Sequence, residues 1–256
     1  MLRAVVFDLD GTLYKGEREI KGAKETVEKI RKMGYLVFFL SNSGTNKRED
    51  ILKKLQSFGI RANINEIYSS CYGAGRYILE NYGKGTRFYA IAEKSAIEEI
   101  ESFGLIFDSE RAKAVIVSLD RSVSYDKIAK AYHLIKKGAT FIATNKDAEY
   151  PVESGTMPGA GAIVASVEAA AGKKPLLIGK PSTLMLDWLT KDNGLRKDDI
   201  LLVGDSIITD VALAKKARTK CALVLSGLVK KAEAKKANAD FVINSVFQLP
   251  KVLSQM

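Results

Sequence analysis

The segment that most constrains the fold of this chain is Val5–Thr12, which reads VVFDLDGT. The apolar run Ala4–Phe7 is typical of a strand buried on both faces of a parallel sheet. Asp8 and Asp10 follow it directly, at the strand end where open α/β sheets bind their ligands. Two carboxylates about 4 Å apart would repel each other by roughly 4 kcal/mol at an effective dielectric constant near 20. The pair therefore needs a cation, a shared proton, or both.

Other polar groups follow apolar runs or lie in well-defined loops later in the chain. The run Ile200–Val203 leads into Asp205, and Asp210 comes shortly after it. Lys180 is placed between a glycine and a proline, and a hydroxyl with an adjacent amide follows another apolar run at Ser41. These clusters supply carboxylates, one lysine, and one hydroxyl with an amide beside it.

Strand-like and helix-like patterns alternate along the whole chain, which indicates an α/β fold. Buried parallel strands are expected at Ala4–Phe7, Val37–Leu40, Ile200–Val203, Ala222–Leu225 and Phe241–Ile243. A second set is expected at Phe88–Ile91, Ala114–Ser118 and Thr140–Ala143. Because the second set interrupts the first, we predict a discontinuous core of residues 1–72 and 177–256 with an inserted domain of residues 73–176.

Helix signals separate these strands. Ala23, Val27 and Ile30 form one apolar stripe, and Asn46 with Glu49 is a capping pattern for a following helix. Further helices are expected over 95–104, opened by a capping box at Ser95–Glu98, and over 125–137.

Composition and charge limit the classes of function. The chain has 46% hydrophobic and 27% charged residues, as expected of an ordinary globular protein. Its two cysteines give neither a disulfide framework nor zinc-ligand spacing. The net charge of +10 could attract nucleic acid or anionic substrates, but the lysines fall in helical patterns typical of solvated faces. With no apolar run of membrane-spanning length, we expect a cytoplasmic protein without a membrane partner.

The ordered clusters resemble those of the haloacid-dehalogenase-like (HAD) phosphatases. Asp8–Thr12 is similar to the nucleophile motif of that superfamily, Ser41 to its second motif, Lys180 to its third, and Asp205 with Asp210 to its fourth. The segments 141–145, 157–161 and 177–182 resemble the 4-nitrophenylphosphatase-like subfamily, whose members carry a class IIA cap. The resemblance implies a Rossmann-like parallel-sheet core with an inserted α/β cap domain.

The resemblance also implies a role for each matching residue. Asp8 would be the nucleophile, Asp10 the general acid and base, and Lys180 a charge partner of both Asp8 and the phosphate. The Mg²⁺ ion would be held by Asp8, by the backbone carbonyl of Asp10 and by Asp205, with Asp210 acting behind these ligands. An all-oxygen ligand set without His or Cys favours Mg²⁺. The residues expected to bind substrate are Ser41, Asn42, Ser43, Asn145 and Lys180.

Three departures from the usual pattern bear on the site. Ser41 replaces a common Thr and Ser43 a common Asn, while Lys146 stands where Pro often follows. The last of these lies in a substrate loop and concerns specificity more than chemistry.

The expected activity is Mg²⁺-dependent hydrolysis of small phosphorylated metabolites through an aspartyl-phosphate. The alternatives are a basic nucleic-acid-binding protein on a HAD-like scaffold and a phosphotransferase with an acceptor other than water. The intact acidic and lysine motifs disfavour nucleic acid as the partner, and the resemblance implies a homodimer formed through the cap. The sequence leaves open phosphoglycolate, pyridoxal phosphate, nucleoside monophosphates and sugar phosphates as substrates.

Overall fold

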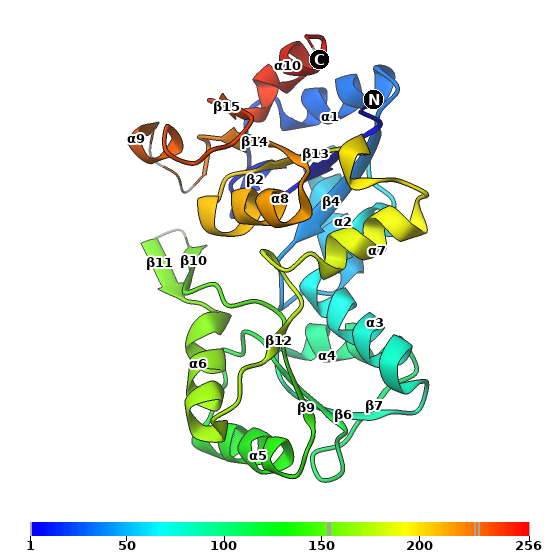
Figure 1. The fold of residues 1–256 in the computed structure, drawn as a ribbon, viewed down its shortest axis with the longest axis vertical. Helices are drawn as coiled ribbons and strands as arrows, with labels where there is room; N and C mark the ends of the chain where they lie inside the picture. Colours follow the sequence, from blue (N-terminus) through cyan, green and yellow to red (C-terminus); the bar gives the residue numbers. More distant parts are fainter. Residues whose placement is uncertain (1, 153–154, 228, 230, 256) are drawn as a thin grey trace. The chain divides into compact units, whose positions relative to one another are not determined.

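The structure is a computed structural model that describes residues 2–152, 155–227, 229 and 231–255. The chain divides into two units (Figure 1). The first unit comprises Met1–Ser41, Ile51–Tyr68 and Lys180–Met256, and the second comprises Asn42–Asp50 and Ser69–Gly179. The expected insert of residues 73–176 lies within the second unit, which also takes in a short segment from much earlier in the chain.

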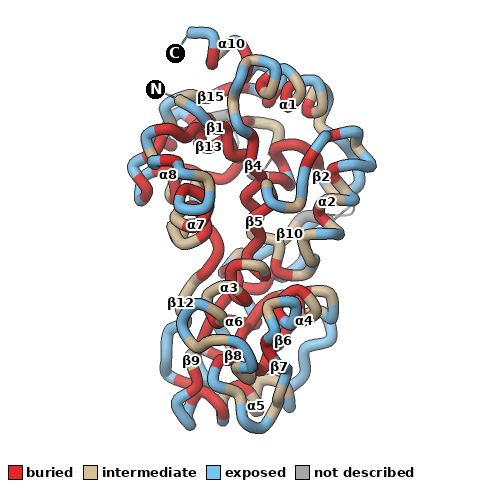
Figure 2. The backbone as a smooth tube through the Cα atoms, turned by 90° about the vertical axis from the view of Figure 1, so that its right-hand side faces the viewer, coloured by how far each residue is buried: buried red, intermediate tan, exposed pale blue. Residues whose placement is uncertain are grey.

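A six-stranded sheet in the order β15-β14-β13-β1-β4-β5 forms the centre of the first unit. Its strands are β1 (Ala4–Phe7), β4 (Leu36–Ser41), β5 (Ile67–Ser69), β13 (Ile200–Gly204), β14 (Lys220–Val224) and β15 (Phe241–Ile243). The strand β1 pairs in parallel with β4 and β13, so that Phe7 lies beside Phe39 and Val203. Four consecutive buried residues in β1 explain its central position, because both of its faces are covered (Figure 2).

Helices and short turns complete the first unit. The helices are α1 (Ala23–Lys32), α2 (Arg48–Ser57), α7 (Leu184–Asp192), α8 (Ala212–Ala217), α9 (Lys231–Ala234) and α10 (Leu249–Leu253). The first turn of α2, up to Asp50, belongs to the second unit. The 3₁₀ turns are η1 (Ile64–Glu66), η2 (Lys197–Asp199) and η4 (Val246–Gln248), and η3 (Ile207–Val211) is a π-helical turn. The strands β2 (Tyr14–Lys15) and β3 (Arg18–Glu19) form a hairpin. The stripe Ala23, Val27 and Ile30 predicted for α1 is fully buried in the core of this unit.

A five-stranded sheet in the order β12-β9-β8-β6-β7 forms the centre of the second unit. Its strands are β6 (Arg87–Ile91), β7 (Ile106–Phe107), β8 (Ala114–Val117), β9 (Thr140–Ala143) and β12 (Leu176–Leu177), and every pair is parallel. The other elements are α3 (Ser70–Tyr82), α4 (Lys94–Glu101), α5 (Tyr125–Lys136), α6 (Ala160–Ala171) and the antiparallel hairpin β10 (Glu149–Val152) and β11 (Gly155–Pro158). Residues of α5 and α6 close a hydrophobic core against β6, β8 and β9.

The predicted α/β fold with parallel sheets is confirmed, and two predicted helix caps are wrong. Helix α2 begins at Arg48 instead of after a cap at Asn46, and the backbone N–H of Arg48 donates to Glu99 at 2.9 Å. Helix α4 begins at Lys94, with Glu93 at the N-cap, so Ser95 lies inside the helix. The Ser95 hydroxyl instead donates to Asp50 at 2.6 Å. Both caps were predicted from local sequence alone. In the structure, the backbone N–H of Arg48 and the hydroxyl of Ser95 instead bind residues that are distant in sequence.

The described helices are all too short or too polar to cross a lipid bilayer.

Candidate active site

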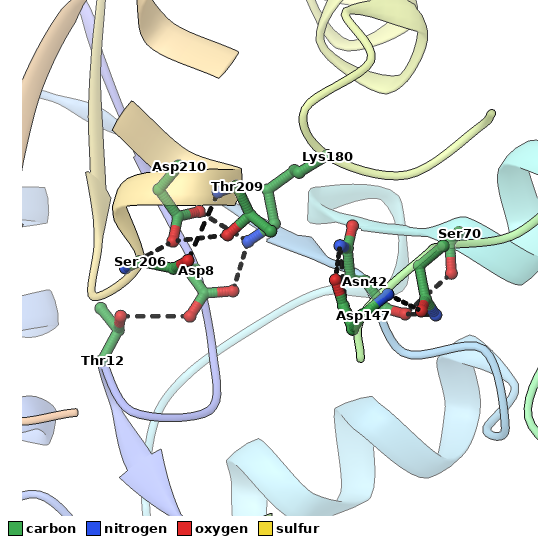
Figure 3. Close-up of polar contacts among 10 residues, drawn as sticks. Asp8, Thr12, Asn42, Ser70, Asp147, Lys180, Ser206, Thr209 and Asp210 are labelled. Atoms are coloured by element: carbon green, nitrogen blue, oxygen red, sulfur yellow. Dashed lines mark hydrogen bonds and ion pairs between the residues drawn. The ribbon is translucent and has the colours of Figure 1, made fainter. Parts of the chain in front are cut away.

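The site begins where β1 ends. The backbone N–H of Asp8 donates to the carbonyl of Val203 at 2.8 Å, so the pairing with β13 continues up to the first carboxylate. The Asp8 side chain is 11% exposed, and its Oδ2 accepts a hydrogen bond from the hydroxyl of Thr12 at 3.1 Å. This bond joins two residues of the turn that follows β1 and fixes the Asp8 carboxylate (Figure 3).

Lys180 joins two of the predicted acidic residues. Its Nζ lies 2.5 Å from Oδ1 of Asp8 and 2.7 Å from Oδ1 of Asp210, and its side chain is only 3% exposed. Residues far apart in sequence are thus brought into one buried ionic cluster, as Figure 3 shows. Charge-assisted hydrogen bonds of this kind are stronger than neutral ones, and they fix the direction of the ammonium group.

The cluster shifts the pKa values of its members. Burial would lower the pKa of Lys180, but Asp210 and Asp8 outweigh it and the pKa is raised, so the ammonium stays charged. Burial raises the pKa of Asp8 to about 8; Lys180 opposes this shift, whereas Asp210 and Asp205 add to it. Among the described residues, Lys180 is the cation that acts on the pKa of Asp8, and the negative charge of Asp210 and Asp205 opposes it.

Asp210 and Asp205 are held in different ways. The second oxygen of Asp210 accepts hydrogen bonds from the backbone N–H of Ser206 at 3.1 Å and from the Thr209 hydroxyl at 3.3 Å. Both oxygens of Asp210 are therefore engaged by the protein. Asp205 is buried among glycines: a Cβ on Gly11 would lie 2.3 Å from its Oδ2, and one on Gly227 would lie 1.9 Å away. Only glycine allows the backbone to approach this carboxylate so closely.

A divalent cation fits these residues. Carboxylate oxygens of Asp8, Asp205 and Asp210 all lie within 4.8 Å of one another, and all three residues form one buried group among the described residues. Oxygen donors favour a hard cation, and the excess of negative charge favours a divalent one. The predicted pair Asp8 and Asp205 is therefore brought together, with Asp210 beside it.

Asp10 lies apart from this ionic cluster. The residue is exposed and forms a bridge with Tyr14 in the turn after β1. The surrounding protein atoms still desolvate its carboxyl group enough to raise its pKa, although Lys54 and a backbone hydrogen bond from Gly16 oppose the shift. A solvent-accessible carboxyl group with a raised pKa can hold a proton and exchange it with water.

The remaining predicted residues are divided between the units. Ser41 is the last residue of β4 and is buried in the first unit. Asn42, Ser43 and Asn145 belong to the second unit. There the amide of Asn145 donates to the backbone carbonyl of Asn42 at 2.9 Å, and the amide of Asn42 lies 3.2 Å from both carboxylate oxygens of Asp147.

Several residues that hold the site were not predicted from the sequence. Thr12 orients Asp8, and Ser206 and Thr209 orient Asp210. Thr12 and Thr209 were visible inside the motifs, but a hydroxyl in a turn gives no sign of which carboxylate it will bind. Gly227 gave no signal at all, because its role appears only when the loop after β14 is placed against Asp205.

Comparison with known proteins shows the family to which the chain belongs. A family model of haloacid dehalogenase-like hydrolases matches residues 5–106, and a HAD-hydrolase-like model matches residues 177–249. The sugar-phosphatase AraL of Bacillus subtilis is 32% identical over 98% of this chain and 93% of its own length. The 5'-nucleotidase YutF of the same organism is 31% identical over 90% of this chain and 89% of its own.

A solved structure extends the likeness to the whole fold. The p-nitrophenyl phosphatase from Archaeoglobus fulgidus superposes with a TM-score of 0.93 at 28% identity, covering 98% of this chain and 99% of its own. The chain belongs to the haloacid-dehalogenase-like hydrolases. Within that family it is a phosphatase with an inserted α/β domain, and the predictions of family, fold class and enzyme class are confirmed.

Proposed function

We propose that this protein hydrolyses small phosphorylated metabolites with the help of Mg²⁺ and through an aspartyl-phosphate on Asp8. The observation that carries this proposal is the bridge made by Lys180 between Asp8 and Asp210, beside the buried Asp205. This arrangement holds a carboxylate nucleophile where positive charge can offset a phosphate dianion. The names of the relatives, which include a sugar phosphatase and a nucleotidase, support phosphomonoesters as the substrate class.

In the first step, an oxygen of Asp8 attacks phosphorus and the bond between phosphorus and the leaving oxygen breaks. The electron pair goes to the leaving oxygen, which takes the proton from the carboxyl group of Asp10. The raised pKa of Asp10 suits it to carry that proton. Thr12 and Lys180 hold the attacking carboxylate in place through their hydrogen bonds.

In the second step, Asp10 takes a proton from water and the water oxygen attacks phosphorus. The bond between phosphorus and Asp8 breaks, which frees the carboxylate and releases inorganic phosphate. Ser41 and Lys180 would hold the phosphate oxygens through both steps. In this proposal the first unit carries the chemistry, and Ser43 stays a proposed substrate-binding residue.

The bound cation would supply positive charge that favours the ionised form of Asp8 and offsets the charge of the phosphate. The carboxylates of Asp8 and Asp205 and the backbone carbonyl of Asp10 would hold it. Asp210 already uses one oxygen on Lys180 and the other on Ser206 and Thr209, so we assign to it the orientation of Lys180.

The variant Asp10→Asn tests the division of labour between the two carboxylates. Asparagine keeps the shape of the side chain and the backbone carbonyl, but it cannot transfer a proton. General acid and base catalysis is typically worth about 10²–10⁴-fold. Because nitrophenolate leaves without protonation, 4-nitrophenyl phosphate should give a burst near one equivalent per enzyme, followed by slow turnover. An alkyl phosphate should lose rate in the first step as well.

Labelled phosphate from the substrate should then be trapped on the peptide that contains Asp8. Equal loss of rate with both substrates and no burst would contradict the role of Asp10. Stoichiometric release of inorganic phosphate by the wild type separates hydrolysis from transfer to another acceptor. Formation of a homodimer through the inserted domain stays a prediction.

A further inference from the structure

Two of the groups proposed to bind phosphate lie at the points where the chain passes between the units. Ser41 is the last residue of the first unit before the chain enters the second at Asn42. Lys180 is the first residue after the chain leaves the second unit at Gly179. The position of each phosphate-binding group is thus tied through one peptide bond to a residue of the second unit.

Asn42 and Gly179 pack against each other inside the second unit. A Cβ built on Gly179 would lie 2.6 Å from Oδ1 of Asn42 and 2.5 Å from the carbonyl oxygen of Thr144. The backbone N–H of Gly179 donates to that same carbonyl at 2.8 Å. The two chain crossings are therefore neighbours, and only glycine fits at the second one.

Asn145 binds the first crossing, at Asn42, while the carbonyl of the preceding residue, Thr144, binds the second crossing, at Gly179. The amide nitrogen of Asn145 donates to the carbonyl of Asn42 at 2.9 Å, and its amide oxygen accepts from the backbone N–H of Asp147 at 3.1 Å. The side chain is buried, and both its donor and its acceptor have partners within the second unit (Figure 3 shows the neighbouring contacts of Asn42 and Asp147). The Asn145 side chain therefore holds the backbone of Asn42 and of Asp147 in place.

The segment that follows Asn42 is anchored to the same unit along its length. The hydroxyl of Ser70 lies 3.0 Å from the carbonyls of Asn42 and Ser43, and the buried Ser118 donates to the carbonyl of Gly44 at 2.6 Å. Farther on, Arg48 pairs with the buried Glu99 through its Nε at 2.9 Å. The segment cannot shift independently of the second unit without breaking these bonds.

We infer that Asn145 is a positioning residue: it holds Asn42 beside the hydrogen-bonded pair Thr144 and Gly179, and so keeps Ser41 and Lys180 in register. This inference rests on the proposed function of Ser41 and Lys180, and it replaces the direct substrate contact that the sequence suggests for Asn145. A residue that contacts the leaving group changes specificity. A residue that positions the phosphate-binding groups changes the handling of every phosphate ester alike.

The test compares two variants. Asn145→Ala removes the hydrogen bond to the Asn42 carbonyl, and Gly179→Ala places a Cβ against Oδ1 of Asn42 and the carbonyl of Thr144. The probes are 4-nitrophenyl phosphate, an alkyl phosphate and inorganic phosphate, which has no leaving group. Because a displacement of about 1 Å can cost about 10²-fold in rate, we expect kcat/KM to fall by about 10- to 100-fold. The fall should be equal for both esters, and phosphate binding should weaken by a similar factor.

The control is Val167→Ala, a truncation in the hydrophobic core of the same unit. It should lower the melting temperature and leave kcat/KM and phosphate binding unchanged. A loss confined to one ester, with phosphate binding unaltered, would show that Asn145 contacts the leaving group and would overturn the inference. Unchanged kinetics in both variants, or an equal loss in Val167→Ala, would overturn it as well.

Calorimetric binding of inorganic phosphate needs no turnover. A wild type that hydrolyses no ester would refute the proposed function, while the binding measurement would still decide the role of Asn145.

Discussion

Replacement of Lys180 by methionine removes the positive charge that bridges Asp8 and Asp210 in the buried carboxylate cluster. Methionine keeps most of the length of the side chain, so the loss isolates the ammonium group and its bonds to Asp8 and Asp210. Breaking a buried ion pair by removing one partner typically costs about 3–5 kcal/mol, because the other charges remain buried without compensation. With a side chain only 3% exposed, Lys180 belongs in that range.

The decrease in the free energy of unfolding that Lys180→Met causes should depend on metal and on pH. In EDTA at about pH 8 we expect Lys180→Met to lower the free energy of unfolding by about 3–5 kcal/mol. Added Mg²⁺ should recover part of it, because the cation supplies positive charge to the same carboxylates. At about pH 5 the loss should be smaller, since protonation of Asp8 relieves the repulsion.

Urea unfolding in EDTA and in Mg²⁺ measures these quantities, and kcat/KM with 4-nitrophenyl phosphate should fall by about 10²–10³-fold. The matched control is Lys197→Met in the same unit, whose partner Asp187 is 2.7 Å away but where both side chains are well exposed. An exposed pair contributes about 0–1 kcal/mol. A loss for Lys180→Met no larger than that of the control would refute the view that the carboxylates depend on Lys180.

Three further results are expected. In EDTA, Asp8→Asn should be more stable than the wild type at about pH 8 and about equally stable at about pH 4. The reason is that the pKa of Asp8 rises from 3.8 to about 8 on folding, so the wild type loses stability as the pH increases between these values. Equal melting temperatures of the two proteins at both pH values would contradict the pKa shift. Activity should vanish in EDTA and return with Mg²⁺, while Ca²⁺ should bind and support little turnover because of its looser geometry; full activity in EDTA would exclude a metal requirement. Gly11→Ala should weaken Mg²⁺ binding measured by calorimetry, because its Cβ would lie 2.3 Å from Asp205 and its φ of +85° disfavours any other residue; unchanged affinity would show that Asp205 can move aside freely.

The sequence was sufficient to predict the strands that carry the site. Ala4–Phe7 was predicted with the bounds it has in the structure, because a continuous apolar run marks a strand buried on both faces. Phe241–Ile243 also has its predicted bounds, but it lies at the edge of the sheet with Val242 46% exposed, so the prediction that this strand is buried is wrong. The family resemblance implied that Lys180 pairs with Asp8, and the structure shows this ion pair. The second bond of Lys180, to Asp210, was not predicted.

Contacts distant in sequence set the limit of that prediction. Glu99 is buried in helix α4 and pairs with Arg48 from a segment about fifty residues earlier. No local pattern marks such a partner, and the same gap explains the two wrong helix caps. The hydrogen bonds of Asn145 could not be predicted from the sequence either, because a polar residue after a strand can face either a ligand or the protein's own backbone.

The split of helix α2 has a consequence for exchanging the inserted domain between enzymes. Its first turn, Arg48–Asp50, belongs to the second unit and the rest of the helix to the first. A transplant that carried only residues 69–179 would leave Glu99 buried without its arginine, and Ser70 and Ser118 without the carbonyls they bind. The module that can be transferred therefore consists of two pieces of chain. A chimera has to take residues 42–50 from the same donor in order to keep these contacts.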